Sequence, residues 1–233
     1  NWHDIKSIRL SDITFILLGG VPFLLLAAFG ASTVPAAYMG TILTGTPVFF
    51  AALLSFILYR QRISLRKFAA LILILFGIAT MIGGRAEAIP SSLLYGVGLV
   101  LLASLIWAGY TLGLKSTKLS PIVIAIVLSY SSFFLTLVMV LSGMMDTNIG
   151  SVSFDEVLPF VLVQGLGVGV VSTLAFSYAV KQLGSIRTLL LGSLSPGLTA
   201  ILATLILKES LSLIMICGIV LSTIGVILSN RAK

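Results

Sequence analysis

The feature that most constrains this chain is a run of 47 residues, Ile13–Tyr59, without a single Asp, Glu, Lys or Arg. Further uncharged runs cover residues 68–84, 88–114, 119–145, 157–180, 188–207 and 210–230. A helix that spans a bilayer needs about 20 apolar residues, so each of these six runs accommodates one helix and the long run accommodates two. With 58% hydrophobic and 9% charged residues, the chain lacks the polar surface that a water-soluble domain requires.

These runs predict an all-α polytopic membrane protein with eight transmembrane helices. The expected bounds are 12–30, 33–59, 65–83, 91–114, 120–143, 157–180, 186–207 and 211–229. A β-barrel can also span lipid, but its strands are about 10 residues long and alternate in polarity. The runs here are longer and apolar on all sides, so we expect helices.

The basic residues predict the orientation in the membrane. With the N-terminus in the cytoplasm, twelve of the 14 Lys and Arg residues fall on the inside: Lys6, Arg9, Arg60, Arg62, Arg66, Lys67, Lys115, Lys118, Lys181, Arg187, Arg231 and Lys233. Only Arg85 and Lys208 fall outside. Cytoplasmic loops of membrane proteins carry such an excess. We therefore assign the net charge of +7 to orientation in the membrane and not to nucleic-acid binding. We expect a plasma-membrane protein whose C-terminus lies on the cytoplasmic side.

One phrase occurs twice in the chain. "LTGTPVFFAALLSFILYRQRIS" at residues 43–64 resembles "GSLSPGLTAILATLILKESLS" at residues 192–212. After a one-residue shift in the turn, the aligned pairs are Pro47 with Pro196, Ile63 with Leu211, Ser64 with Ser212 and Gly77 with Gly225. The copies belong to the second and seventh expected helices, which run in opposite directions. This predicts an inverted-topology repeat, a device typical of transporters.

The repeat predicts a division of the chain at residue 86. Residues 87–233 form a repeat of five helices, whereas residues 1–86 hold three. We therefore expect two further helices before Asn1 and ten helices in the natural protein; a natural eight-helix protein is the alternative.

The second copy and the expected helix 91–114 resemble the EamA-type transporters of the drug/metabolite transporter superfamily. In that family a helix with a central proline is followed by a short acidic turn and a glycine-containing helix, as in "SLSPGLTAILATLILKESLSLIMICGIVLSTIGVIL". Trp107–Ala108 matches the aromatic step of the helix that opens a repeat. In the first copy, Gln61 stands where the family has the acid. The resemblance implies two inverted five-helix repeats and transport of small organic solutes.

The spans offer no chemistry for an enzyme. None of the uncharged runs contains an acid, a base or a His, and the single His is His3. A zinc helix, an aspartyl pair and a serine nucleophile elbow are all missing from them. We expect no catalytic residues, no metal site and no cofactor.

Polar and aromatic side chains within the spans are the candidates for a solute pathway: Thr44, Thr46, Ser104, Trp107, Tyr110, Thr111, Gln164, Ser193, Ser195 and Thr199. Hydroxyls in a span most often bond their own backbone, and Trp107 is equally consistent with a packing or interfacial role. Gln164 is expected to bond a neighbouring helix or to face a cavity. Pro47 and Pro196 are expected to kink their helices, either to open a cavity or for packing alone.

The sequence therefore predicts a carrier that moves an amino acid, a related metabolite or a drug-like compound by alternating access. Outward transport is what the family resemblance implies. The partners are a small-molecule substrate and the lipid bilayer; the sequence leaves a homodimer open. A receptor or scaffold without transport is the alternative, which the inverted repeat disfavours because a scaffold needs no two-sided symmetry.

Overall fold

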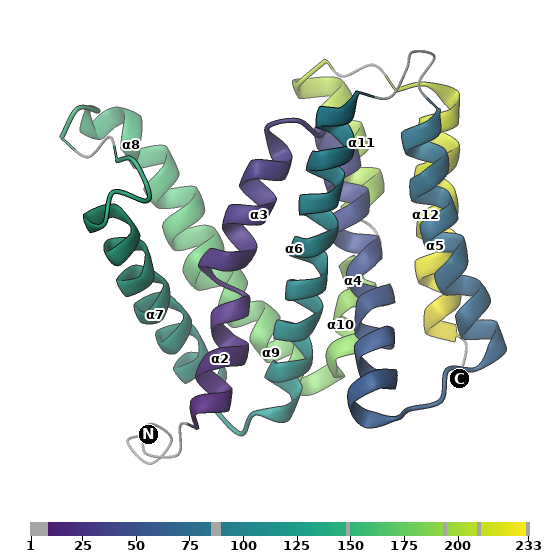
Figure 1. Cartoon of the computed structure of the whole chain (residues 1–233), viewed down its shortest axis with the longest axis horizontal. Helices are drawn as coiled ribbons and strands as arrows, with labels where there is room; N and C mark the ends of the chain where they lie inside the picture. The colour runs from purple at the N-terminus through teal and green to yellow at the C-terminus, as the bar shows by residue number, and fades with distance from the viewer. Residues whose placement is uncertain (1–8, 85–89, 148–149, 193–194, 209–210, 232–233) are drawn as a thin grey trace.

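The structure is a computed structural model that describes residues 9–84, 90–147, 150–192, 195–208 and 211–231. In these ranges every regular element is a helix, and the helices form one bundle (Figure 1). The elements are α2 (Leu10–Leu18), α3 (Val21–Ala31), α4 (Ala36–Tyr59), α5 (Leu65–Gly83), α6 (Ser91–Ser116), α7 (Pro121–Leu141), α8 (Phe154–Phe160), η1 (Val161–Ser172), α9 (Thr173–Leu183), α10 (Ser185–Leu191), α11 (Ser195–Ile206) and α12 (Leu213–Arg231).

The expected all-α polytopic fold is confirmed. Six helices in the described ranges are long and apolar enough to cross a membrane: Leu10–Ala31, Ala36–Tyr59, Leu65–Gly83, Ser91–Ser116, Pro121–Leu141 and Phe154–Leu183. Shorter apolar helices, Ser195–Ile206 and Leu213–Ser229, lie in the last two expected spans. The protein is therefore an integral, multi-pass membrane protein.

The first span contains a break that the sequence analysis did not predict. The span consists of two helices, α2 and α3, which meet at Gly19–Gly20. Pro22 stands in the first turn of α3. A Cβ atom on Gly19 would lie 2.7 Å from the ring of Tyr110 in α6. Glycine is therefore required where this break packs against α6.

The sixth span changes helix type along its length. Pro159 lies inside α8, and the π-helix η1 follows it. Proline removes a backbone donor from a helix, and η1 contains Gly165, Gly167 and Gly169, which favour regular α-helix poorly. The Thr173 hydroxyl donates to the Val168 carbonyl oxygen five residues earlier, as the wider π-helix allows.

The seventh span, expected as a single helix 186–207, is described in two parts, α10 and α11, and residues 193–194 between them lie outside the described ranges. Pro196 is the second residue of α11, so the chain just before it is not described and the predicted kink at Pro196 stays a prediction. Pro47 lies inside α4, where a proline removes one backbone hydrogen bond, and its predicted kink also stays a prediction.

The bundle is built around α4 and α6. Figure 1 shows α7 and α8 on one side of these helices and α5 with α12 on the other. The largest buried side chains are Tyr38, Tyr110, Ile16, Ile42, Ile74, Met81 and Leu93. The hydroxyl of Tyr38 donates to the Met81 carbonyl oxygen at 2.9 Å and so joins α4 to α5.

Helices α5 and α12 approach each other to backbone contact. A Cβ atom on Gly77 would lie 2.6 Å from the Gly218 carbonyl oxygen, and one on Gly225 would lie 2.9 Å from the Ala70 carbonyl oxygen. Ser222, between the two glycines of α12, is fully buried. Small residues at such a crossing allow close van der Waals packing, which drives helix association where lipid removes the hydrophobic effect.

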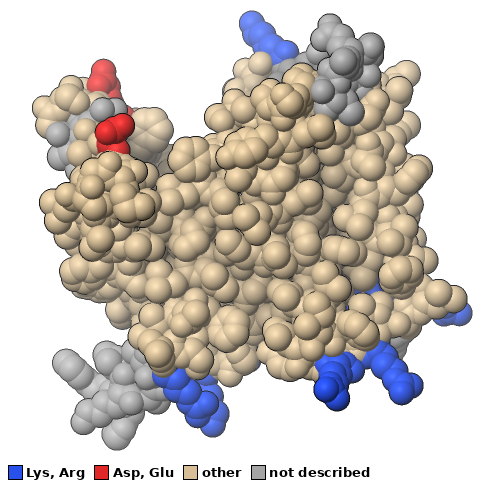
Figure 2. Space-filling model, viewed as in Figure 1, with Lys and Arg blue, Asp and Glu red and all other residues tan. Residues whose placement is uncertain are grey.

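The charges are segregated between the two ends of the bundle. On the face shown in Figure 2, Lys and Arg gather mainly at one end, and Asp and Glu appear at the other. We name the first the basic end: α4 and α6 end there and α5 begins there, close to Arg60, Arg66 and Lys115. Helix α2 begins and α12 ends on this same side (Figure 1), which agrees with an even number of passes.

The crossing of α5 and α12 gives a stability prediction. Gly77→Ala places a methyl group 2.5 Å from the Ser222 backbone nitrogen, so the helices must separate. We expect a loss of about 1–3 kcal/mol, typical of overpacking, seen as a lower midpoint of thermal unfolding in detergent.

Gly98→Ala in α6 is the matched control, because nothing lies within 4 Å of its added Cβ atom. We expect an unchanged or higher midpoint, since alanine favours a helix by about 1 kcal/mol over glycine. Equal midpoints for the two variants would contradict the backbone contact.

Candidate solute pathway

A cavity of about 320 Å³ lies in the middle of the bundle. It is lined by Phe23, Leu43, Thr44, Trp107, Phe176, Thr188, Leu189 and Gly192. These residues come from α3, α4, α6, α9 and α10, with Gly192 following α10 directly. We call this space the central cavity.

Three aromatic rings, those of Phe23, Trp107 and Phe176, form one wall of the central cavity, and the Tyr110 ring packs against this wall. The Trp107 ring lies 4.7 Å from that of Phe23 and 5.1 Å from those of both Tyr110 and Phe176, centroid to centroid. The rings of Tyr110 and Phe176 stack at 6.2 Å with an interplanar angle of 14°. Aromatic pairs in this range favour a fixed arrangement, so the wall is rigid and apolar.

Small residues on α6 bring this wall together. A Cβ atom on Gly113 would lie 2.4 Å from the side chain of Phe15, and one on Gly109 would lie 3.4 Å from that of Leu18. Helix α2 therefore packs close to α6, and the glycine break after α2 leaves room for the Tyr110 ring. The break and the two glycines position α3, which carries Phe23.

Two side-chain hydroxyls line the central cavity, those of Thr44 and Thr188. Each donates to a backbone carbonyl four residues earlier: Thr44 to Gly40 at 2.7 Å and Thr188 to Gly184 at 3.0 Å. A hydroxyl oxygen that donates in this way still has lone pairs that can accept a hydrogen bond. None of the lining residues carries a charge.

A second hollow, of about 660 Å³, opens toward the end opposite the basic end, and we call it the outer hollow. It is lined by residues 31–36 together with Met39, Gly40, Leu43, Thr199 and Leu207. Leu43 borders both this hollow and the central cavity. A Cβ atom on Gly40 would lie 2.6 Å from the Thr199 side chain, so α4 and α11 are in close contact here.

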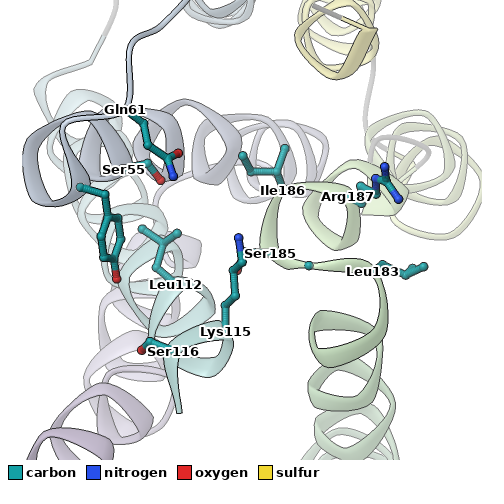
Figure 3. A pocket seen from close by; sticks show the side chains of 11 residues that line it. Ser55, Gln61, Leu112, Lys115, Ser116, Leu183, Ser185, Ile186 and Arg187 are labelled. Atoms are coloured by element: carbon teal, nitrogen blue, oxygen red, sulfur yellow. The ribbon is translucent and has the colours of Figure 1, made fainter. Parts of the chain in front are cut away.

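A third hollow, of about 480 Å³, lies at the basic end, and we call it the inner vestibule (Figure 3). Its lining residues are Ser55, Tyr59, Gln61, Leu112, Lys115, Ser116, Leu183, Gly184, Ser185, Ile186 and Arg187. In Figure 3, Lys115 extends from the end of α6 toward the Ser185 turn, and Gln61 and Ser55 lie next to each other across the space. The Ser185 hydroxyl donates to the Thr111 carbonyl oxygen at 2.9 Å and fixes α10 to α6.

Helix α4 borders all three hollows in sequence. Met39 and Gly40 face the outer hollow, Thr44 faces the central cavity, and Ser55 and Tyr59 face the inner vestibule. At 1.5 Å per residue, the distance from Met39 to Tyr59 along the helix is about 30 Å, close to the thickness of the hydrocarbon core. The hollows therefore lie in a row along one membrane-spanning helix.

The structure brings several of the predicted pathway residues together. Thr44 and Trp107 line the central cavity, Tyr110 stacks against its aromatic wall, and Thr199 lines the outer hollow. Ser195 begins α11 and is half-buried. Ser193 lies outside the described residues.

Other predicted residues serve the helices themselves. The hydroxyls of Thr46, Ser104 and Thr111 are buried and donate to the carbonyl oxygens of Ile42, Val100 and Trp107. Gln164 lies exposed on η1, a helix without buried residues, and it does not line the central cavity.

Phe23 and Phe176 are the cavity residues that the sequence analysis missed. Both lie in long apolar runs, where a phenylalanine that lines a cavity has the same local pattern as one that faces lipid. Their role follows from the packing of α3 and α9 against α6.

The sequence analysis assigned Lys115 and Arg187 to membrane orientation alone. The structure shows that both residues also line the inner vestibule.

Comparison with known proteins agrees with this architecture. The profile of the EamA-like transporter family matches residues 94–231. An uncharacterized transporter of Synechocystis sp. is 26% identical over 218 residues, which cover 91% of this chain and 64% of that protein. The chain thus spans about two thirds of the length of this curated relative.

A solved structure described only as the crystal structure of a protein has the same fold. It matches with a TM-score of 0.62 at 16% identity, and the match covers 99% of this chain and 90% of the other. At a sequence identity of 16%, this similarity shows a shared fold and does not show a shared function.

The aromatic wall gives a spectroscopic prediction. The chain has two tryptophans, so Trp107 is the sole emitter in a Trp2→Phe background. In that background Phe176→Ala removes a ring 5.1 Å from Trp107 and opens the central cavity to water. We expect a red-shifted emission and stronger quenching by acrylamide.

Phe134→Ala is the control, because it removes an exposed ring on α7, and it should leave the emission and the quenching unchanged. Equal responses of the two variants would contradict the contact between the Phe176 and Trp107 rings.

Proposed function

Because the chain belongs to the EamA-like transporter family, we propose that it carries small organic solutes across the plasma membrane by alternating access. The observation that carries the proposal is the row of three hollows along α4, one toward each end of the bundle and one between them. A carrier needs access from both sides to a site near the middle of the membrane.

The turns after α4 and α11 support the proposed division into inverted repeats, residues 1–86 and 87–233. Arg60 and Lys208 occupy equivalent positions in the two aligned copies, 148 residues apart as are Ser64 and Ser212. Among the described residues they are the non-glycine residues with positive φ, 50° and 56°. Ser64 accepts from the Lys67 amide and Ser212 from the Met215 amide, so both following helices begin with the same cap.

The crossing of α5 and α12 supports the same division. The alignment pairs Ala70 with Gly218 and Gly77 with Gly225. In the structure Gly77 lies against Gly218, and Gly225 lies against Ala70. When each residue is replaced by its aligned counterpart, the first contact becomes the second. A two-fold axis produces this exchange of partners, and in an inverted repeat that axis lies in the membrane plane. The profile match at residues 94–231 falls within the proposed second repeat.

The central cavity is where we propose that solute binds. Leu43 and Gly192, which align in the two copies, both line it, as expected for a site between repeats. Its aromatic wall and two hydroxyls suit an amino acid, a related metabolite or a drug-like compound with an apolar portion. We propose export as the direction, with the basic end and the C-terminus in the cytoplasm.

The orientation predicts the accessibility of single cysteines. In a Cys217→Ala background, Ser91→Cys and Ser151→Cys should react with a membrane-impermeant maleimide added to intact cells. Ser116→Cys, at the basic end of α6, should react only after permeabilisation. Labelling of Ser116→Cys from outside together with protection of Ser151→Cys would reverse the orientation.

Transport itself is tested in proteoliposomes that are loaded with a defined mixture of amino acids and small organic acids. We expect at least one solute to leave faster than from protein-free liposomes, as measured by mass spectrometry. Trp107→Ala removes the centre of the aromatic wall, and Thr44→Val removes a hydroxyl at nearly constant volume. Both should slow that solute by about tenfold or more, since one lost site contact of 1.4 kcal/mol has this effect.

Thr80→Val is the matched control for Thr44→Val. Thr80 also donates to the carbonyl oxygen four residues earlier, at 2.9 Å, but it is half-buried on α5 and lines none of the three hollows. Its variant should transport at the unaltered rate. If Trp107→Ala and Thr44→Val retain full transport, or lose only as much as they lose folded protein, the site lies elsewhere.

A further inference from the structure

We propose that the inner vestibule is a binding site for anionic oxygen groups, the carboxylate or phosphate of a small solute or of a lipid headgroup. Binding of an anion there requires no transport activity. A role of the vestibule in solute entry rests on the proposed function.

Two cations share this space without an acidic neighbour in its lining. Lys115 belongs to the last turn of α6, and Arg187 belongs to α10, which begins at Ser185. The described residues that line the vestibule include no Asp or Glu. Both residues line the vestibule, so an anion bound there would be attracted by two positive charges.

Neutral donors complete the lining. Gln61 supplies an amide, and Tyr59 supplies a phenolic hydroxyl from the last residue of α4. Carboxylate and phosphate oxygens accept hydrogen bonds from such groups, and arginine in particular can bind them with two parallel bonds. The lining therefore combines charge with directional donors.

The backbone around the vestibule is shaped at two residues with positive φ. Arg60, with φ of 50°, follows α4 and turns the chain. The backbone N–H of Gln61 therefore donates back to the Ser55 carbonyl oxygen at 3.4 Å. This holds Gln61 over the vestibule. Gly184, with φ of 85°, joins α9 to α10 and sets the start of the α10 wall. A non-glycine residue pays roughly 1–2 kcal/mol for such a conformation, so the turn at Arg60 persists because its surroundings hold it.

The vestibule also differs from the rest of the basic end. Lys118, Arg62 and Arg66 are exposed at the same end but do not line it. A volume of about 480 Å³ is in the range of small-molecule sites, about 300–1,000 Å³. Membrane orientation alone explains the number of cations at this end, but it does not explain why two of them share one donor-lined hollow.

The test uses the full chain in nanodiscs of zwitterionic lipid and two probes of matched shape. N-acetyl-L-tryptophan carries a carboxylate, and N-acetyl-L-tryptophanamide is neutral; equilibrium dialysis with radiolabelled probes measures the binding of each. We expect the carboxylate to bind about tenfold more tightly at low salt. That preference should fall toward one as the salt rises from about 20 to about 500 mM, because the vestibule is open to solvent.

The variants assign the preference to the two cations. Lys115→Met and Arg187→Met should each weaken carboxylate binding by about threefold to tenfold, and the double variant should bind both probes alike. Lys118→Met is the matched control and should keep the full preference. Lys115→Arg keeps the charge and should retain the preference too, which separates loss of the site from loss of folding.

Nanodiscs with about 30% phosphatidylglycerol distinguish the two sources of the anion. If a lipid headgroup occupies the vestibule, this lipid reduces carboxylate binding to the level of the double variant. If the site takes free solute, the wild-type chain still binds the carboxylate more tightly than the double variant does.

The proposal is overturned by equal binding of the two probes, by an unaffected double variant, or by an equal loss in Lys118→Met. These outcomes are independent of transport. Solute efflux without a carboxylate preference contradicts this proposal alone, and a carboxylate preference without efflux contradicts the proposed function alone.

Discussion

Water does not reach backbone groups inside a bilayer, so each N–H and C=O must find its partner within the protein. The rest of this structure follows from that constraint. It explains why every regular element in the described ranges is a helix, and why the hydroxyls of Thr44, Thr46 and Thr111 all donate to carbonyl oxygens four residues earlier. The same constraint requires that an interrupted helix has protein or a cavity around it. The break between α2 and α3 meets this requirement, because it lies against the Tyr110 ring.

The same constraint gives small residues their importance. Apolar side chains gain little by leaving lipid for another helix, so close van der Waals contact has to hold the bundle together. Gly77, Gly218 and Gly225 supply this contact between α5 and α12, and Gly113 supplies it between α6 and α2. The first contact lies between the two proposed repeats. The second supports the aromatic wall of the central cavity.

Much of the fold could be predicted from the sequence, because the uncharged runs report the spans directly. The expected helix 65–83 agrees with α5, and 91–114 with α6 to within two residues. The break at Gly19–Gly20 and the π-helix after Pro159 were not predicted, since a glycine pair or a proline in a span is compatible with either a continuous or an interrupted helix. For the site, composition could identify Thr44 and Trp107 as rare polar or amphipathic groups in apolar runs. It could not identify Phe23 or Phe176, whose role depends on which helix faces each side chain.

The central cavity and the inner vestibule place different demands on a solute, and α10 connects them. Ile186 and Arg187 line the vestibule, and the next two residues, Thr188 and Leu189, line the central cavity. An unpaired carboxylate among the rings of Trp107 and Phe176 would lose its hydration without a compensating charge, at a cost of several kcal/mol. A solute that spans both hollows avoids this cost, because its anionic end stays between the cations while its apolar part reaches the aromatic wall. If both proposals hold, the protein selects amphipathic anions. The cations determine where the anionic group binds, and the aromatic wall determines which apolar group can enter the central cavity. None of the described residues that line the outer hollow is charged, so this lining offers an anion no opposite charge. The two linings therefore differ in the affinity that they offer an anion, while the solute gradient or its coupling sets the direction of net movement.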